Sequence, residues 1–242
     1  TAIQRDKREV SGRTADNEPF CTGYDKLLIA TGAAPTMPDM PGKELLMPLK
    51  QLEHGRQIKQ AIQDREVKNA AIMGMGYIAL EMCEALTARG IHVSMVKPSS
   101  RFLPWLPEEM AQIVQEEVSK NGVDLHLGTT VTSIEKTPDR VRLLCDNTTL
   151  VADLVLGATG VRPCSELARD AGLALGVFDA ISVDPYLRTS DPDIFAAGDC
   201  GDAFHVVTGK KTWIPLALRA NRAGWAVADN LFGENTSLQG VA

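Results

Sequence analysis

Residues 69–81, with the sequence NAAIMGMGYIALE, decide the fold of this chain. An apolar strand leads directly into Gly74 and Gly76, and a helical pattern follows to about Arg89. In such a unit Gly74 permits the tight turn, Gly76 lets the backbone approach a pyrophosphate, and Ala79 lets the helix pack closely on the strand. The N–H groups at the start of the helix attract phosphates. The stretch therefore predicts a dinucleotide-binding βαβ unit, and a strand–helix turn without a ligand is the alternative.

The next strand is expected over residues 91–96 and ends at Lys97. An acidic residue at this place favours NAD, whereas a basic residue accommodates the 2′-phosphate of NADP. Lys97, followed by Ser99, Ser100 and Arg101, therefore favours NADPH or the use of both coenzymes. The alternative is that Lys97 is a solvated surface charge and that NADH is the coenzyme.

Apolar periodicity predicts further elements on both sides of this unit. Helices are expected at residues 48–66, 107–120, 165–173 and 215–231. Strands are expected at 24–30 and near 194–197, and a buried strand with a glycine turn at 154–160. A solvent-edge hairpin is expected over 1–20 and an antiparallel meander over 123–156. The proline-rich residues 35–43 predict a crossing between domains.

Composition restricts the classes of function. The chain has 25 Lys and Arg against 31 Asp and Glu, a net charge of −6, which disfavours nucleic acid as a partner. No apolar run approaches the ~20 residues of a membrane span, so no membrane partner is expected. The five cysteines lack C-x-x-C and metal-ligand spacings, which predicts reduced thiols, no metal site and a cytoplasmic protein.

Four blocks, in this order and spacing, resemble the pyridine nucleotide–disulfide oxidoreductase family. They are LIATGAAP (28–35), GMGYIALE (74–81), GATGVRP (157–163) and TSDPDIFAAGDC (189–200). Two further stretches are most similar to the branch of coenzyme A-disulfide reductases, NADH oxidases and NADH peroxidases, namely VVTGKKTWIPLA (206–217) and ANRAG (220–224). Oxygenase-coupled ferredoxin reductases share the Thr-Ser-Asp-Pro block but fit the Thr-Gly-Lys stretch less well.

The resemblance implies which residues contact the cofactors. Those implied for the nicotinamide coenzyme are Gly74, Gly76, Tyr77, Ile78, Glu81, Lys97 and Gly160. Those implied for FAD are Thr31, Gly32, Asp199, Leu216 and Ala217. Asp199 is implied to accept from a ribityl hydroxyl, and a helix N-cap is its alternative role. For Tyr77 and Glu81 the alternatives are a packed ring and an exposed helical carboxylate.

The resemblance also implies what lies outside the chain. The family's N-terminal FAD βαβ unit, with the redox-active cysteine of this branch, is expected upstream of residue 1, and a dimerisation domain is expected after residue 242. The five cysteines are accordingly expected to be structural thiols, and no catalytic residue is assigned within the chain. We expect an α/β fragment: a doubly wound Rossmann-like NAD(P)-binding domain with an antiparallel meander at 43–161, and an incomplete FAD-binding-type module from 1–42 and 162–242.

The implied activity is that of an NAD(P)H-dependent, FAD-containing oxidoreductase. Hydride passes from nicotinamide to flavin, and electrons pass on to a disulfide-type acceptor such as coenzyme A disulfide or persulfide, to oxygen or to peroxide. The parent protein is expected to be a homodimer that acts on a small-molecule substrate, and the fragment alone to be inactive. The alternatives are a truncated dinucleotide-binding module without turnover and a ferredoxin-type reductase with a protein acceptor.

Overall fold

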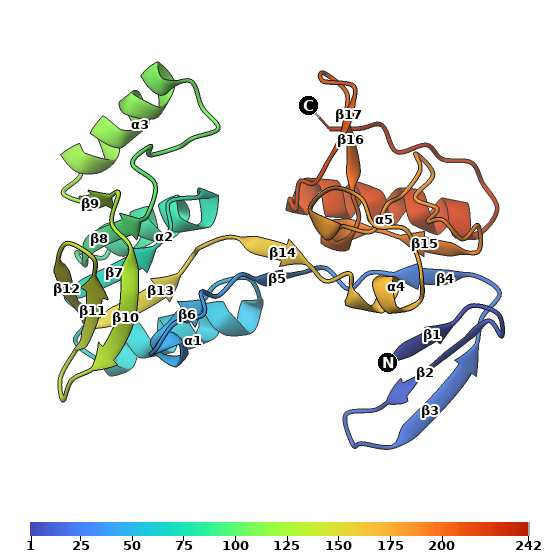
Figure 1. Ribbon diagram of the computed structural model, residues 1–242, viewed down its shortest axis with the longest axis horizontal. Coiled ribbons are helices and arrows are strands. Elements are labelled where there is room, and N and C mark those ends of the chain that lie inside the picture. Colours follow the sequence, from blue (N-terminus) through green and yellow to red (C-terminus); the bar gives the residue numbers. More distant parts are fainter. Residues whose placement is uncertain (242) are drawn as a thin grey trace. The chain divides into compact units, whose positions relative to one another are not determined.

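The computed structural model describes residues 1–241 and divides the chain into two compact units. One is formed by Pro35–Val161, and we call it the inserted unit. The other is formed by Thr1–Ala34 together with Arg162–Ala242, and we call it the split unit. The chain leaves the split unit along β5 (Ala33–Pro35) and returns along β14 (Val161–Pro163), and these strands pair in a two-stranded sheet (Figure 1).

A five-stranded parallel sheet forms the centre of the inserted unit. Its order is β6 (Met47–Pro48), β13 (Leu154–Gly157), β7 (Asn69–Met73), β8 (His92–Lys97) and β9 (Asp124–Leu127). The crossovers carry α1 (Leu52–Asp64), α2 (Tyr77–Thr87) and α3 (Glu108–Lys120). Helix α2 forms here because Ala79, Cys83 and Leu86 recur on one face and are all buried.

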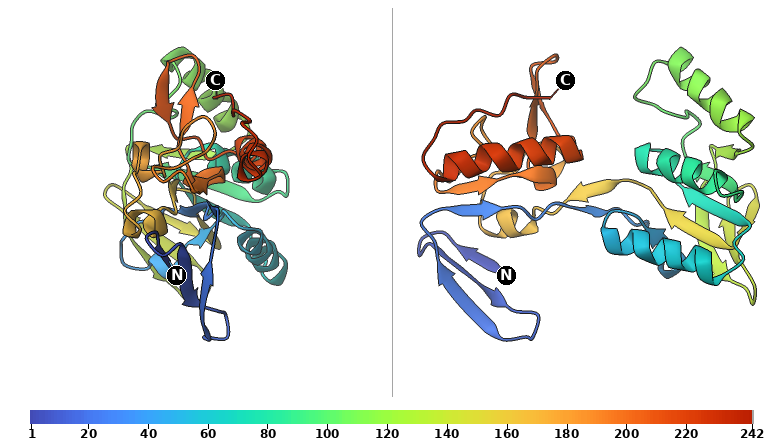
Figure 2. Two further views of the ribbon diagram at one scale, coloured as in Figure 1. Left: turned by 90° about the vertical axis from the view of Figure 1, so that its right-hand side faces the viewer. Right: turned by 180° about the vertical axis from the view of Figure 1, so that it is seen from behind.

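The two faces of this sheet are covered differently. Alternate residues of β7 point to opposite faces, so Ile72 packs with the three helices and Ala71 packs in a second apolar cluster. The second cluster lies under an antiparallel meander of β10 (Val131–Lys136), β11 (Val141–Cys145) and β12 (Thr149–Ala152). Figure 2, right panel, shows α1 and α2 on the near side of the sheet. The predicted α/β class with a parallel sheet is confirmed, and the meander takes the face that helices cover in a doubly wound sheet.

The meander is shorter than the predicted range of 123–156. β9 pairs in parallel with β8, and β13 is a fully buried parallel strand between β6 and β7. The α3 crossover brings β9 back in the same direction as β8, and an alternating apolar pattern alone does not encode strand direction.

The boundary expected at residue 42 lies earlier, because the proline-rich stretch belongs to the inserted unit. The carbonyl of Pro41 accepts from the N–H of Ile134 at 2.9 Å. Gly42 has a φ of +83°, and a Cβ there would lie 1.9 Å from the Ile134 carbonyl oxygen. These contacts bind the stretch to the meander.

The split unit contains smaller sheets. β1 (Ala2–Gln4), β2 (Glu9–Arg13) and β3 (Pro19–Gly23) form a three-stranded antiparallel sheet, one strand more than the predicted hairpin. The remaining elements are the parallel pair β4 (Leu27–Ile29) and β15 (Ile194–Ala196), the hairpin β16 (Ala203–His205) and β17 (Lys210–Thr212), and the helices α4 (Glu166–Asp170) and α5 (Ala217–Leu231). Buried side chains of β4, β15 and α5 form its core, including Ile29, Phe195 and Ala223.

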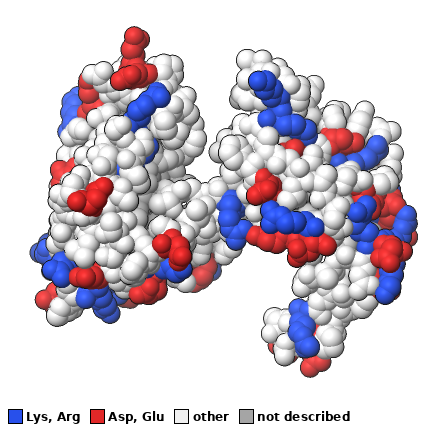
Figure 3. Space-filling view, in the orientation of Figure 1, with Lys and Arg blue, Asp and Glu red and all other residues white. Residues whose placement is uncertain are grey.

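Two features bear on the partners expected from composition: the charges at the surface and the length of the helices. Positive and negative side chains are interspersed on the faces of both units seen in Figure 3. Among residues 1–241, no helix is long and apolar enough to cross a membrane.

Candidate functional site

The turn after β7 requires glycine at residue 74. Gly74 has a φ of +113°, a conformation that side chains disfavour. A Cβ there would lie 2.1 Å from the carbonyl oxygen of Ala158, in the turn that follows β13. The N–H of Gly74 also donates to the carbonyl of Val96 at 2.9 Å. The close approach therefore brings together the carboxyl ends of β7, β8 and β13.

Gly76 has a different role from Gly74. It is the N-cap of α2 with φ −90°, and no side-chain hydrogen bond caps the helix. A Cβ at Gly76 would meet no atom within 4 Å. The first-turn N–H groups of a helix have no partner within the helix, and at Gly76 no side chain caps them. Ala79, with no exposed area, lets α2 lie close to the sheet. This combination fits a bound phosphate group.

The other residues predicted on α2 are at its surface. Tyr77 is 67% exposed, and its ring centroid lies 5.6 Å from that of Trp105. Ile78 is half-buried and Glu81 is exposed. Sequence analysis missed Trp105, whose only signal was a large aromatic side chain in a proline-flanked loop.

The structure shows where the half-buried Lys97 ammonium lies: it is hydrogen-bonded within its own loop. Nζ donates to the carbonyls of Arg101 and Phe102, both at 3.0 Å. Burial lowers the pKa of this ammonium below its usual value. Arg101 itself is exposed and only distantly engaged, with Nη2 at 3.5 Å from the Leu106 carbonyl oxygen. The side chain that the loop presents is therefore Arg101.

Gly160 belongs to the same turn as Ala158. Its φ is +115°, a Cβ there would meet no atom within 4 Å, and its carbonyl accepts from the N–H of Thr36 at 2.9 Å. The structure thus gathers Gly74, Gly76 and Gly160 at the carboxyl edge of the parallel sheet, where ligands of open α/β sheets bind.

In the split unit, the structure brings Asp199 near the start of α5. Asp199 lies in a short 3-10 helix, Gly198–Cys200, directly after β15, so it is not the N-cap that the alternative reading proposed. The indole N–H of Trp213 donates to the Asp199 carbonyl at 2.8 Å. Leu216, the N-cap of α5, and Ala217 follow Trp213 closely in the chain, and both are exposed.

A buried arginine next to this place was not predicted. Arg219, on the buried face of α5, donates through Nη1 to the Gly198 carbonyl at 2.9 Å and through Nη2 to the Asp202 backbone carbonyl. Burial lowers its pKa, although Asp202 and Asp199 oppose that shift. The available signal was a charged residue at a core position of an amphipathic helix. These hydrogen bonds tie the 3-10 helix to the start of α5.

Thr31 and Gly32 lie where the split unit leads into β5. The hydroxyl of Thr31 donates to the Cys164 carbonyl, and the Gly32 carbonyl accepts from the Cys164 N–H at 2.9 Å. Gly32 has a φ of +71° with open space where a Cβ would lie.

The cysteines do not resemble activated nucleophiles. Cys83 and Cys200 are buried. Burial raises the pKa of the Cys83 and Cys145 thiols, and this favours the unreactive protonated form.

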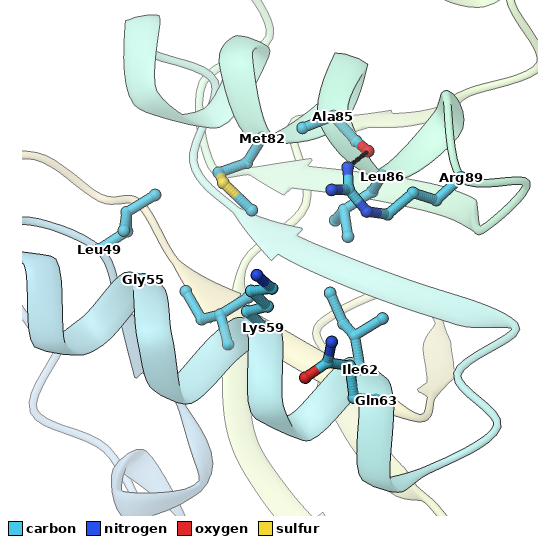
Figure 4. A pocket seen from close by; sticks show the side chains of 10 residues that line it. Leu49, Gly55, Lys59, Ile62, Gln63, Met82, Ala85, Leu86 and Arg89 are labelled. Atoms are coloured by element: carbon cyan, nitrogen blue, oxygen red, sulfur yellow. Dashed lines mark hydrogen bonds between the residues drawn. The ribbon is translucent and has the colours of Figure 1, made fainter.

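An apolar groove lies away from the glycine turn (Figure 4). It runs between α1 and α2, and its lining includes Ile58, Ile62, Met82, Leu86 and Arg89. None of the residues predicted to bind a cofactor lines it. The groove therefore adds nothing to the dinucleotide site.

Comparisons with known proteins agree with this geometry. The family described as pyridine nucleotide-disulphide oxidoreductase matches residues 1–224. An NADH oxidase of Methanocaldococcus jannaschii is 37% identical over 221 residues, which are 90% of this chain and 49% of that protein. A CoA-dependent NAD(P)H sulfur oxidoreductase of Pyrococcus furiosus is 34% identical over 90% of this chain and 50% of its own.

A solved structure gives the same result. The NAD-dependent persulfide reductase from A. fulgidus has a TM-score of 0.92 and 35% identity, covering 100% of this chain and 45% of that chain. The chain thus spans about half the length of the curated relatives that it matches.

Proposed function

Because this chain belongs to the pyridine nucleotide-disulphide oxidoreductase family, we propose that it carries the NAD(P)H-binding unit and part of the FAD-binding unit of a flavoenzyme. The whole enzyme takes hydride from a nicotinamide coenzyme onto FAD and passes electrons to an acceptor. The observation that carries this proposal is the turn from Gly74 to Gly76, where no side chain caps the helix N-terminus and a Cβ at Gly76 would lie in open space.

The inserted unit is the proposed nicotinamide-coenzyme site. The N–H groups of Gly76, Tyr77 and Ile78 hold the pyrophosphate, since a helix N-terminus favours negative charge. Tyr77 and Glu81 lie further along the exposed side of α2 and orient the nicotinamide. Gly160 keeps the turn after β13 free of a side chain that would obstruct the coenzyme.

The split unit is the proposed FAD site. The carboxylate of Asp199 accepts from the ribityl chain, and Leu216 and Ala217 place the start of α5 against the isoalloxazine ring. A helix N-terminus there stabilises negative charge on a reduced flavin. Thr31 and Gly32 line the exit toward the other unit. Flavin and nicotinamide supply the redox chemistry, while the chain binds and orients them.

The acceptor is proposed to be a disulfide or persulfide of coenzyme A, or else oxygen or peroxide. The names of the matching relatives, NADH oxidase and CoA-dependent sulfur oxidoreductase, support this range. A protein acceptor is the second candidate, because a ferredoxin reductase from Rhodopseudomonas palustris matches with a TM-score of 0.86 and 30% identity. We further propose that the enzyme is a cytoplasmic homodimer.

The chain alone is proposed to bind nicotinamide coenzyme without turnover, because the sequence contains one Gly-x-Gly turn of this kind and not a second for FAD. Gly76→Val tests the site. Its side chain would occupy the open space that a pyrophosphate needs, while its φ of −90° suits a side chain, so the fold should survive. Losing a charge-assisted contact worth about 1.5–3 kcal/mol should weaken binding by roughly 10- to 100-fold.

The measurement is titration with NADH and NADPH, followed by the fluorescence of the reduced nicotinamide. Gly55→Val is the matched control, since Gly55 lies in α1 of the same unit and an added Cβ there meets only Leu49, at 3.8 Å. Unchanged affinity in Gly76→Val, with an intact circular dichroism spectrum, would show that the site is elsewhere.

A further inference from the structure

The loop that follows β8 is held from inside by one side chain. The ammonium of Lys97 reaches the carbonyl oxygens of Arg101 and Phe102, both at 3.0 Å. An ammonium has three donors, so two of them are used within the loop. Both carbonyls are thereby directed toward Lys97 and not toward a bound ligand.

Backbone and hydroxyl contacts fix the first half of this loop. The carbonyl of Lys97 accepts from the N–H of Thr129 at 3.0 Å, and that of Ser99 accepts from the N–H of Gly128 at 3.1 Å. The hydroxyl oxygen of Ser99 accepts from the N–H of Arg101 at 3.1 Å. The loop is therefore tied to the segment after β9 as far as residue 99.

Packing does not fix its second half. A cavity of about 320 Å³ separates the loop from α3, with Ser100 and Arg101 on the loop side and Gln112 and Glu116 on the helix side. Cavities of this size and polarity hold water, which does not impose one loop conformation. Phe102 and Leu103, both 3% exposed, anchor the end of the stretch, and the Ser99 hydroxyl donates to the Arg101 carbonyl at 3.2 Å. The two hydrogen bonds from Lys97 add a further constraint at the exposed residues between them.

We propose that Lys97 is a positioning residue, which holds the Lys97–Phe102 loop so that Arg101 and Ser100 face the adenosine phosphates of the coenzyme. This inference rests on the proposed function. It departs from the sequence-based expectation, in which Lys97 itself attracts a 2′-phosphate. In this role Lys97 acts on NADH and NADPH alike through the conformation of the loop, in which two of its three donors are used.

The first variants to compare are Lys97→Met, which keeps the length but has no donors, and Lys97→Arg, whose guanidinium can donate to both carbonyls. Lys97→Met should raise the dissociation constants of NADH and NADPH by about the same factor, roughly tenfold, which corresponds to about 1.4 kcal/mol. Lys97→Arg should restore both to within about threefold of wild type. Equal losses for both coenzymes together with rescue by Lys97→Arg would show that Lys97 acts through the loop, whereas a direct phosphate ligand would change the NADH-to-NADPH ratio.

Hydrogen exchange of the loop amides gives an independent readout. Exchange at residues 99–103 should accelerate in Lys97→Met but not in Arg101→Met, although both variants should bind coenzyme more weakly. A loss confined to NADPH would identify Lys97 as a direct phosphate ligand and overturn the proposal, as would unchanged binding in Lys97→Met. If the wild-type chain binds neither coenzyme, the proposed function fails, whereas the exchange experiment still reports whether Lys97 holds the loop.

Discussion

The inserted unit and the split unit use similar elements but bury them to different extents. The inserted unit is one continuous segment, and its five parallel strands are covered by helices on one face and by the meander on the other. In the split unit, β4 and β15 form a parallel sheet of only two strands. Its helix α5 leaves Leu218 and Trp225 77% and 76% exposed. Parallel sheets are normally buried on both faces, so the split unit is the less complete of the two.

The hydrogen bonding of buried polar groups is also less complete in the split unit. Two buried atoms of the split unit, Asp202 Oδ2 and Arg219 Nε, have no hydrogen-bond partner within residues 1–241. Such atoms cost about 1–3 kcal/mol each. The two segments of this unit are joined by ion pairs at the surface, such as Arg5 with Asp191 and Lys26 with Asp193. The comparison teaches that the two segments of the split unit are joined both by an apolar core and by exposed ion pairs, which solvent screens.

The largest expected effect is a loss of unfolding free energy that is confined to the inserted unit. Gly74→Ala places a Cβ 2.1 Å from a backbone oxygen at a φ of +113°, so both the backbone conformation and the packing oppose it. We expect a loss of about 2–4 kcal/mol in the unfolding free energy of that unit. Urea unfolding with hydrogen exchange resolved by segment measures it. Gly76→Ala is the matched control and should be nearly neutral, and equal losses in both variants would contradict the role given to Gly74.

A smaller effect tests the polar interior of the inserted unit. The Asp153 carboxylate accepts from the N–H groups of Lys68 at 2.9 Å and Asn69 at 2.8 Å, and lies 3.4 Å from Nε of Arg140. Burial raises its pKa, but these hydrogen bonds and Arg140 outweigh burial and hold the pKa below 3.8. Asp153→Asn should cost about 1–2 kcal/mol at pH 7.

The dependence on pH has a definite sign. Because the folded pKa of Asp153 is lowered, its stabilisation is present above about pH 4 and is lost as the pH falls through the folded value. The stability difference between wild type and Asp153→Asn, measured by denaturant unfolding at several pH values, should therefore shrink below pH 4. A difference that stayed constant down to pH 2 would assign the effect to shape and not to charge.

The smallest expected effect belongs to the split unit. Asp193 accepts from Nζ of Lys26 at 2.6 Å and from Arg8, and all three side chains are partly exposed. Hydrogen bonds and the charges of both partners lower the pKa of Asp193, Lys26 first. Asp193→Asn should lower the unfolding midpoint of the split unit only slightly, and 1 M salt should remove the difference. A large loss that persists in salt would show that this unit is not held by screened charges.

Sequence analysis succeeded where the signal is local. The stretch 69–81 encodes strand, turn and helix within one contiguous run, and the structure has β7, the glycine turn and α2 in that order. It did not find the buried Arg219, which ties the turn at Asp199 to α5.

The misses depend on contacts that residue types do not encode, either between distant residues or within a loop of specific conformation. The parallel direction of β9 follows from its pairing with β8, and the place of residues 35–42 follows from Pro41 meeting Ile134. The partners of Lys97 lie only four and five residues away, but a loop conformation decides whether the ammonium turns inward. Residue type at a strand end indicates the charge that is present, not the atoms that it meets.

The pairing of β4 with β15 has a consequence for the order in which the chain folds during synthesis. Lys26, next to β4, meets Asp193, next to β15, across 167 positions, so this contact cannot form until most of the chain has been made. The inserted unit lies between them and is complete earlier. Once it has folded, it shortens the flexible loop that the pairing must close, and this reduces the entropic cost by about 1 kcal/mol. A mutation that delays the inserted unit should therefore also slow the assembly of the split unit, even though it touches none of its residues.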